Sequence, residues 1–231
     1  MKANAIVPVD SITGLILAGG RGSRMGGVDK GLQLFQNKTL IDHVIARLAP
    51  QVKAILINAN QHHDVYAKYG HRMFADHEKN FGGPLAGIDA AWDYCETDYL
   101  LTVPCDSPFL AADLALQLSK AFHVTEDIPT QPPILAAIAA TNETQDDSHC
   151  LRLQLHPVFC LMHRSAAAAL KKFLADGGSK MRDFFDTINA AHIMFDQSEH
   201  FVNLNTLQDL REYESLSCLP RSNQEQHLDA E

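Results

Sequence analysis

The chain has 231 residues, of which 46% are hydrophobic, and its formal net charge is −9. This length is enough for one domain with a sizeable core. The acidic balance argues against sequence-independent binding to nucleic acid, because that function requires a basic surface. The chain contains no apolar stretch long enough to span a bilayer or to act as a secretory signal. We therefore expect neither nucleic acid nor membrane among its partners.

The five cysteines form no C-x-x-C pair, and their number is odd. This pattern argues against a disulfide framework and against a zinc knuckle. It fits a reducing compartment, so we expect a cytoplasmic location. We also expect residues 1–11 to form an N-terminal extension and the polar residues 217–231 to form a disordered tail.

Short apolar runs alternate with amphipathic segments along the first half of the chain. The predicted strands are 14–18, 52–60, 72–76 and 99–103, and the predicted helices are 39–49, 61–69, 85–95 and 111–122. In the second half we expect strands at 134–140, 151–162 and 192–195, helices at 165–174, 181–188 and 207–216, and an exposed acidic loop at 141–150. Alternation of this kind predicts βαβ units and an α/β fold with a mostly parallel sheet.

A glycine-rich loop follows the first predicted strand. Five glycines lie between Gly19 and Gly27, and the loop carries the cations Arg21, Arg24 and Lys30. Glycines allow the backbone to approach a ligand closely, and clustered N–H groups attract anions. Three cations in one loop favour a phosphate ligand. We expect a helix to begin directly after this loop; the alternative is an ordinary glycine-rich turn with solvated arginines.

Two common phosphate-binding motifs do not fit this loop. A dinucleotide fingerprint beginning at Gly20 would require glycine where Met25 stands. A Walker P-loop would require Gly-Lys-Ser/Thr, but Gly27 is followed by Val28 and Asp29. If the loop binds phosphate, it does so as a class of site other than these two.

Polar side chains also follow three other predicted strands. Asn58, Asp76 and Asp106 each stand where a strand ends. Parallel strands joined by right-handed crossovers bring their carboxyl ends to one edge of the sheet, where ligands of open α/β folds bind. We therefore expect these residues to converge with the glycine-rich loop. Each one, taken alone, is equally compatible with a turn or with a residue that caps its own backbone.

Four motifs in order resemble the molybdenum cofactor guanylyltransferase family. They are L-A-G-G followed by R-M-G-G-V-D-K-G at 17–31, G-P-L-A-G at 83–87, P-C-D-S-P at 104–108 and V-N-x-N-T at 202–206. The resemblance extends from about residue 12 to about residue 213. It implies a Rossmann-like three-layer α/β/α nucleotidyltransferase fold over 12–216, with nucleotide bound by the N-terminal half and acceptor by the C-terminal half.

The resemblance also implies an activity and its partners. The expected reaction transfers GMP from GTP to molybdenum-molybdopterin, which forms a guanine dinucleotide cofactor and releases pyrophosphate. Magnesium is the expected cofactor, since it bridges phosphate oxygens while one or two carboxylates hold it. Proteins that deliver molybdopterin or mature molybdoenzymes are further expected partners.

Site residues follow from the same resemblance, position by position. Asp106 corresponds to the metal ligand, and Lys30 to the family's lysine, which is expected to neutralise charge as pyrophosphate leaves. Lys30 and Arg24 are the expected phosphate ligands. Without the resemblance, Asp106 would be interpreted as an ordinary turn aspartate. For Lys30, the alternative is a solvated lysine at the start of a helix, where a cation is unfavourable unless an anion offsets it.

The nucleotide and acceptor sites are also carried over from the family. The residues expected to contact GTP besides Lys30 and Asp106 are Leu17, Ala18, Gly19, Gly20, Asn58 and Asp76. The residues expected to face the acceptor are His156, Asn203 and Asn205. For His156, a histidine satisfied within the fold is an equal alternative.

Three alternative functions stay open at this point. A cytidylyltransferase acting on the same acceptor typically has A-A-G where this chain has Ala18-Gly19-Gly20, and it lacks G-P-L-A-G. A sugar-1-phosphate nucleotidyltransferase is the second alternative. The third is a non-catalytic molybdopterin carrier, which the presence of both Lys30 and Asp106 disfavours.

Overall fold

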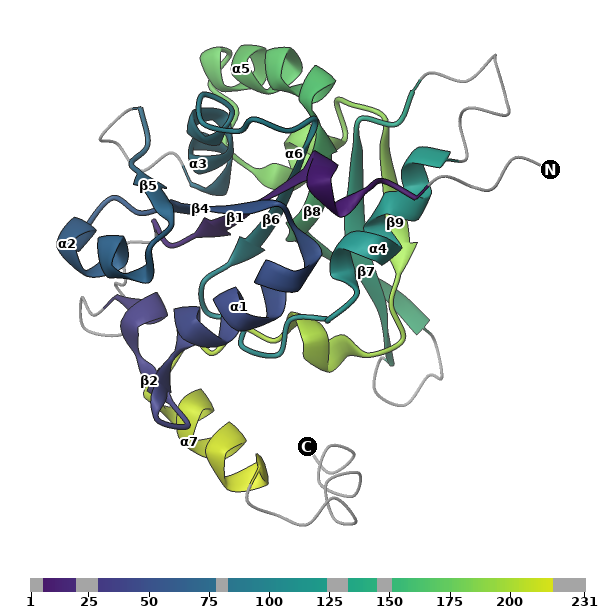
Figure 1. Ribbon diagram of the computed structural model, residues 1–231. Helices are drawn as coiled ribbons and strands as arrows, with labels where there is room; N and C mark the ends of the chain where they lie inside the picture. Colours follow the sequence, from purple (N-terminus) through teal and green to yellow (C-terminus); the bar gives the residue numbers. More distant parts are fainter. Residues whose placement is uncertain (1–5, 20–28, 78–82, 124–132, 145–150, 218–231) are drawn as a thin grey trace.

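The computed structural model describes residues 6–19, 29–77, 83–123, 133–144 and 151–217. Within these ranges lies a seven-stranded sheet in the order β5-β4-β1-β6-β8-β7-β9 (Figure 1). Its strands are β1 (Ile12–Leu17), β4 (Ala54–Asn58), β5 (Arg72–Phe74), β6 (Tyr99–Pro104), β7 (Ala136–Thr144), β8 (Leu151–His163) and β9 (Ala190–Met194). The crossovers in this order place β1 between β4 and β6, at the centre of the N-terminal half of the sheet.

The sheet is mostly parallel, as predicted. β1 pairs in parallel with β4 and β6, β4 with β5, and β7 with β9. β8 runs antiparallel to both of its neighbours, β6 and β7. The carboxyl ends of the parallel strands therefore meet along one edge of the sheet, as the βαβ pattern requires.

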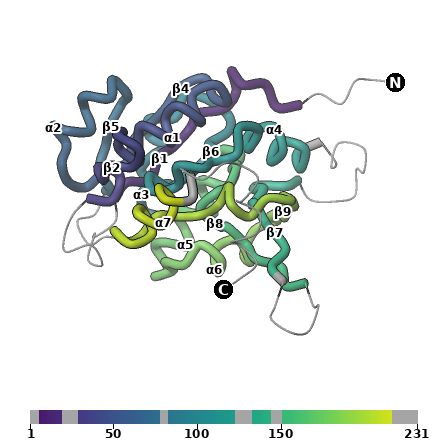
Figure 2. The backbone as a smooth tube through the Cα atoms, turned by 90° about the horizontal axis from the view of Figure 1, so that it is seen from below, coloured from purple at the N-terminus to yellow at the C-terminus, as the bar shows by residue number. Residues whose placement is uncertain are grey.

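Helices cover both faces of the sheet (Figure 2). They are α1 (Leu40–Leu48), α2 (His63–Tyr66), α3 (Pro84–Ala91), α4 (Leu114–Ser119), α5 (Ala167–Ala175), α6 (Met181–Phe185) and α7 (Leu207–Ser217). Buried residues of α1 and α4 pack on one face, and those of α3, α5 and α6 pack on the other. The three-layer α/β/α architecture is therefore confirmed. Each face has its own apolar core, because successive side chains of a strand point to opposite faces.

Helix α1 shows why the chain folds as predicted at this point. Ile41, Val44 and Leu48 are fully buried and recur at helical spacing. Thr39 caps the helix: its side chain accepts from the Asp42 backbone N–H, and the Asp42 carboxylate accepts from the Thr39 N–H. This capping box begins the helix at its observed position.

The expectation of a helix directly after the glycine-rich loop is wrong. A short 3₁₀ helix, η3 (Lys30–Leu32), comes first, and a two-stranded hairpin of β2 (Leu34–Phe35) and β3 (Lys38–Thr39) precedes α1. The hairpin turn has positive φ angles of 49° at Gln36 and 63° at Asn37. Two such residues match the twist of a tight hairpin and break the helical pattern.

The predicted loop at 141–150 is also partly wrong. Strand β7 continues to Thr144 and pairs with β8 along this whole length. Residues 145–150 lie outside the described ranges. Asn142 and Glu143 are exposed, so their polar side chains face solvent while their backbone pairs with β8.

The last described helix packs away from the main cores. In Figure 1, α7 lies beside the β2–β3 hairpin. Phe35, Leu40, Leu204 and Leu210 form the small apolar cluster beneath it. Among the described residues, no helix is long and apolar enough to cross a membrane.

Candidate active site

The described part of the glycine-rich segment lies at the centre of the sheet edge. The Ala18 N–H donates to the Asn58 carbonyl at 2.8 Å, and the Leu17 carbonyl accepts from the Cys105 N–H at 3.2 Å. A Cβ at Gly19 would lie 3.1 Å from the Asn60 side-chain nitrogen. Backbone from β1 is therefore held between the ends of β4 and β6.

Two predicted site residues lie outside the described ranges. Gly20 and Arg24 fall within 20–28, as does Arg21. Their predicted roles toward phosphate stay predictions.

Beside the end of β1, three polar side chains form a closed network. Asp76 accepts from the Asn58 amide at 2.9 Å through one carboxylate oxygen and from the Asn60 amide at 2.8 Å through the other. The Asp76 N–H donates back to the Asn60 side chain at 2.9 Å. Each carboxylate oxygen keeps a second lone pair, so Asp76 can accept further hydrogen bonds from a ligand.

Sequence reasoning missed Asn60 in this network. Residues 58 and 60 are two apart, and in extended backbone such residues lie on the same side. That spacing was the available signal for a pair of amides at one strand end. Asn58 is buried with 2% of its surface exposed, so its amide needs the partner that Asp76 supplies.

Lys30 and Asp106 meet on the other side of β1. The Lys30 ammonium lies 3.3 Å from an Asp106 carboxylate oxygen, and it donates to the Asn205 side-chain oxygen at 2.5 Å. The structure therefore brings together a residue after the glycine-rich loop, one after β6 and one before α7. This arrangement holds a cation and a carboxylate in one shallowly buried cluster.

Burial governs the charge of Asp106. Removal from water raises the pKa of this carboxyl above its ordinary range, and the neighbouring Lys30 ammonium lowers it in opposition. A carboxylate with 7% of its surface exposed is costly to ionise without a cation beside it. Lys30 supplies that cation in this structure.

The C-terminal segment before α7 is hydrogen-bonded to the loop that contains Asp106. The Leu204 N–H donates to the Asp106 carbonyl at 2.9 Å, and the Asn203 side chain accepts from the Ser107 hydroxyl. Asp209 accepts from the Asn205 N–H at 2.7 Å and from the Thr206 N–H at 3.0 Å, and the Thr206 hydroxyl accepts from the Asp209 N–H, which caps the start of α7. Both predicted asparagines thus lie at this edge, but only Asn205 touches Lys30.

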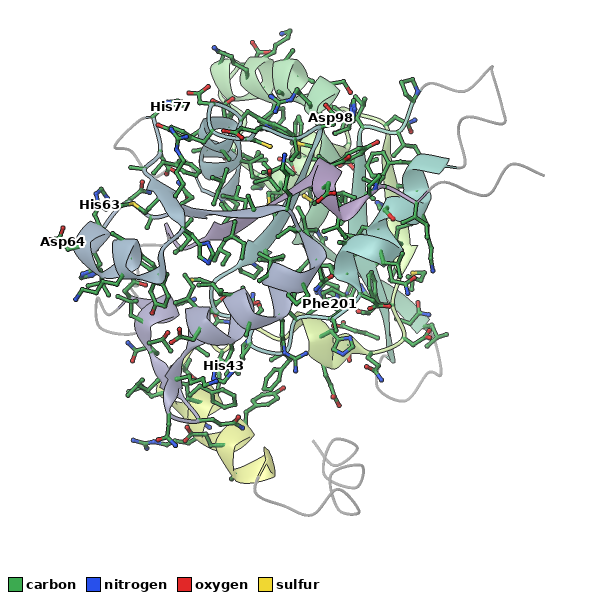
Figure 3. The ribbon with its side chains drawn as sticks, in the orientation of Figure 1. His43, His63, Asp64, His77, Asp98 and Phe201 are labelled. Atoms are coloured by element: carbon green, nitrogen blue, oxygen red, sulfur yellow. The ribbon has the colours of Figure 1, made fainter. Side chains whose placement is uncertain are left out.

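His156 lies elsewhere, on β8. Its ring stacks on Phe201 at the end of the 3₁₀ helix η8 (Ser198–Phe201), with ring centres 4.5 Å apart, and its Nε2 is 2.8 Å from the Thr141 hydroxyl. Figure 3 labels Phe201 on that turn, a little below the centre of the molecule in this view. Burial and then the Arg182 charge lower the pKa of His156 to about 4, so its ring is neutral at neutral pH. No described hydrogen bond joins it to Lys30 or Asp106.

A metal at this edge would have few protein ligands. Within the described residues, no group of three or more histidine, cysteine or acidic side chains is close enough to hold an ion. Asp106 is the carboxylate of the Lys30 cluster. A single carboxylate suits Mg²⁺, which completes its shell with waters and substrate phosphates.

Comparison with known proteins decides the family. The model of the MobA-like NTP transferase domain matches residues 14–192. The chain belongs to this family. It is 44% identical to a molybdenum cofactor guanylyltransferase of Ralstonia nicotianae over 90% of this chain and 98% of the relative. It is 40% identical to one of Acidovorax ebreus over 91% of this chain and 99% of the relative.

Solved structures agree on the architecture. The molybdopterin-guanine dinucleotide biosynthesis protein A from Archaeoglobus fulgidus superposes with a TM-score of 0.66 at 22% identity, covering 89% of this chain and 98% of that one. A 4-diphosphocytidyl-2C-methyl-D-erythritol synthase from Anaerococcus prevotii gives 0.64 at 12% identity, covering 90% and 98%. At these identities the likeness shows the nucleotidyltransferase fold. The MobA-like NTP transferase model ends at residue 192, so Asn203, Asn205 and α7 lie beyond it.

Proposed function

We propose that this MobA-like NTP transferase is a molybdenum cofactor guanylyltransferase, which transfers GMP from GTP to molybdenum-molybdopterin and releases pyrophosphate. The observation that carries the site assignment is the Lys30–Asp106–Asn205 cluster at the carboxyl edge of the sheet. Strand β1 separates this cluster, at the end of β6, from the Asn58–Asp76 network at the ends of β4 and β5. Two polar groups on either side of β1 suit a ligand with a base at one end and a triphosphate at the other. The relatives' names supply the nucleotide and the acceptor.

In this proposal, the backbone from Leu17 to Gly19 and the Asn58–Asp76 pair hold the nucleoside. An Asp76 carboxylate accepts from both N–H groups on the Watson–Crick edge of guanine, which adenine and cytosine do not present together. Asn58 and Asn60 hold the carboxylate in the orientation that this contact needs. Gly20 completes the backbone contacts to the nucleotide.

On the triphosphate side, Lys30 and Arg24 bind phosphate oxygens and offset the charge of the leaving pyrophosphate. Asp106 would hold Mg²⁺, which supplies charge neutralisation across the phosphates. Asn205 orients the Lys30 ammonium through its 2.5 Å hydrogen bond. No protein nucleophile is required, because an acceptor phosphate can attack the α-phosphorus in line; catalysis then comes from positioning and charge.

We assign acceptor binding to the C-terminal half, with Asn203, Asn205 and His156 as its residues. Asn203 is exposed at the edge beside Ser107 and is accessible to a ligand. The proposal includes transient contact with proteins that deliver molybdopterin or mature molybdoenzymes. It also includes a reducing compartment, the cytoplasm, because Cys95, Cys105 and Cys160 are buried free thiols.

Nucleotide binding and turnover test this function. Calorimetry with Mg²⁺ should show GTP bound more tightly than CTP, ATP or UTP, and the protein should release pyrophosphate when GTP and molybdenum-molybdopterin are both present. Asp106→Asn, which keeps the size of the side chain, should lower kcat by at least about 100-fold because the metal carboxylate is lost.

Three results would contradict the assignment. Preference for CTP would indicate a cytidylyltransferase. Transfer to a sugar 1-phosphate but not to molybdopterin would change the acceptor. Acceptor binding without turnover in the wild-type protein would indicate a carrier, and unchanged kcat in Asp106→Asn would remove Asp106 from the metal site.

A further inference from the structure

Tyr66, the last residue of α2, makes a buried contact that the proposed chemistry does not use. Its side chain is fully buried. Its hydroxyl donates to an Asp29 carboxylate oxygen at 2.6 Å. A hydrogen bond to a charged acceptor in a buried setting is stronger than one between neutral groups. Helix α2 is therefore tied to the residue that directly precedes Lys30.

Asp29 in turn makes hydrogen bonds to the η3 turn, which contains Lys30. The same carboxylate oxygen accepts from the Gly31 N–H at 3.1 Å, so Asp29 is the N-cap of η3. The residues before and after Lys30 are joined by this bond. The Asp29 carbonyl accepts from the Gln33 side chain at 3.2 Å. The backbone at Lys30 is thus held from both directions, and Tyr66 fixes the carboxylate that holds it.

The Tyr66 hydroxyl also lies where the loops of Lys30 and Asp106 meet. A Cβ added to Gly31 would lie 2.8 Å from the Tyr66 oxygen and 3.2 Å from the Cys105 sulfur. Cys105 is buried and directly precedes Asp106. One hydroxyl therefore packs against the η3 turn at the point where that turn meets the loop after β6.

Burial keeps the Tyr66 hydroxyl protonated at neutral pH. Removal from water raises the pKa of Tyr66 far above its ordinary value, and the nearby Cys105 and Asp29 raise it further. The hydroxyl therefore remains a hydrogen-bond donor to Asp29 at neutral pH. Its part in the site is geometric rather than acid–base.

We propose that Tyr66 is a positioning residue for GMP transfer: through Asp29 it holds the Lys30 turn against the Cys105–Asp106 loop. This inference rests on the proposed function, in which Lys30 neutralises the leaving pyrophosphate. Lys30 needs its placement most when charge develops on the leaving group. Loss of the Tyr66 hydroxyl should therefore lower kcat more than it weakens GTP binding, which also draws on contacts at β1, β4 and β5.

Tyr66→Phe tests the proposal, because it removes the hydroxyl and keeps the ring. We expect kcat for pyrophosphate release to fall by about 10- to 100-fold, as a misplacement of about 1 Å at a reacting centre can cause. The dissociation constant for GTP should change by less than about threefold. The matched control is Tyr69→Phe, which removes a tyrosine hydroxyl bound to Thr39 at 2.8 Å in the neighbouring turn, η5 (Ala67–Tyr69). It should keep kcat within about twofold of wild type.

A second pair of variants tests the route through Asp29. Asp29→Ala should lower kcat about as far as Tyr66→Phe, and Asp29→Asn should lose less, because its side-chain oxygen still accepts from Tyr66 and Gly31. Combining Tyr66→Phe with Asp29→Ala should give no further loss than the larger single effect. If Tyr66→Phe does not fold, a wild-type kcat in Asp29→Ala would overturn the proposal, because that variant also removes the acceptor of the Tyr66 hydroxyl.

The outcomes separate this proposal from the proposed function. All effects are ratios to the wild-type protein, with whichever nucleotide the wild type transfers. If the wild-type protein transfers CMP, the guanylyl assignment is overturned. The ratio of kcat in Tyr66→Phe to kcat in the wild type still tests the positioning role. A Tyr66→Phe protein that melts lower but keeps the wild-type kcat, or single effects that multiply in the double variant, would overturn the positioning role.

Discussion

At the scale of single residues, the amides of Asn58 and Asn60 hold the Asp76 carboxylate, to which the proposed function assigns the base. Asn58 and Asn60 each donate to one oxygen of the carboxylate, so the group cannot rotate without losing a hydrogen bond. A fixed carboxylate is preorganised for two parallel donors. This arrangement makes Asp76 the residue on which nucleotide choice depends in the proposed function.

Asp76→Ala should therefore weaken GTP binding by about 10- to 100-fold, since hydrogen bonds to a charged group contribute about 1.5–3 kcal/mol. ATP binding should change little, because adenine has no adjacent pair of donors for this carboxylate. Calorimetry with both nucleotides measures the difference. Equal weakening of GTP and ATP would show that Asp76 acts on the sugar or on the fold rather than on the base.

His156 gives a pH dependence at the same scale. Its pKa is lowered from 6.5 to about 4, chiefly by burial, so the unfolded chain takes up the proton first as pH falls. The stability that neutral His156 contributes is complete above pH about 6.5 and is lost as pH decreases toward 4.

His156→Gln removes this titration. We expect the difference in unfolding free energy between wild type and variant, measured by urea denaturation, to shrink as pH is lowered from 7 to 4. The subtraction cancels the other histidines, which both proteins share. A difference that stays constant across this range would mean that His156 titrates normally in the folded chain.

At the scale of elements, the contact between α3 and the end of β4 leaves no space for a side chain. A Cβ at Gly87 would lie 2.4 Å from the Asn58 side-chain oxygen and 2.9 Å from Leu17. The helix therefore approaches the strand end closely enough to hold Asn58 against Asp76. The close approach of α3 to Asn58 explains why the last residue of the G-P-L-A-G motif, Gly87, is glycine.

Gly87→Ala tests that reading. Alanine in place of glycine should stabilise a helix by about 1 kcal/mol, so any loss must come from the overlap with Asn58. We expect GTP binding to weaken at least about tenfold, because displacement of Asn58 breaks its 2.9 Å bond to Asp76. Unchanged GTP affinity, with a raised melting temperature, would show that Asn58 moves aside without consequence.

Elements were predictable from the sequence where one local rule decides them. The rule that polar residues at parallel strand ends converge placed Asn58 and Asp76 together, and the structure joins them by a hydrogen bond. The β2–β3 hairpin was missed, because two left-handed residues at Gln36 and Asn37 interrupt a pattern that otherwise continues into α1. No Asn-Gly or Asp-Gly pair signals that turn.

The contacts of Lys30 had no such local signal. Asn205 stands 175 residues away, and Tyr66 meets Asp29 across 37 residues. Apolar spacing identifies Tyr66 as part of a short helix, but it carries no information about the group its hydroxyl meets. The resemblance named Lys30, Asp106 and Asn205; only the folded chain shows that they touch.

At the scale of the whole molecule, the segment before α7 ties the C-terminal part of the chain to the site. Leu204 is fully buried with Phe35, Leu40 and Leu210, and its backbone N–H donates to the Asp106 carbonyl at 2.9 Å. Leu204 therefore both packs in this apolar cluster and holds the Asp106 loop.

Leu204→Ala should lower the unfolding free energy by about 2–5 kcal/mol and should also lower kcat, because loosening the segment before α7 misplaces both Asp106 and Asn205. The matched control is Leu210→Ala, in the same cluster but without a backbone contact to Asp106. It should lose stability with a smaller loss of kcat. Urea denaturation and turnover of both variants measure the split. Equal losses of kcat would assign the effect to stability alone.

The long separation between Lys30 and Asn205 also has a consequence in time. Both residues must be made before the ammonium acquires its amide partner, and 175 positions lie between them. At a synthesis rate of about 5–20 residues per second, that interval is about 9–35 s. Asp106 is made 76 positions after Lys30, so from then on two of the three members of the Lys30 cluster are present while Asn205 is still to be made. Each newly made chain therefore contains Lys30 and Asp106 before it contains the amide that completes their cluster.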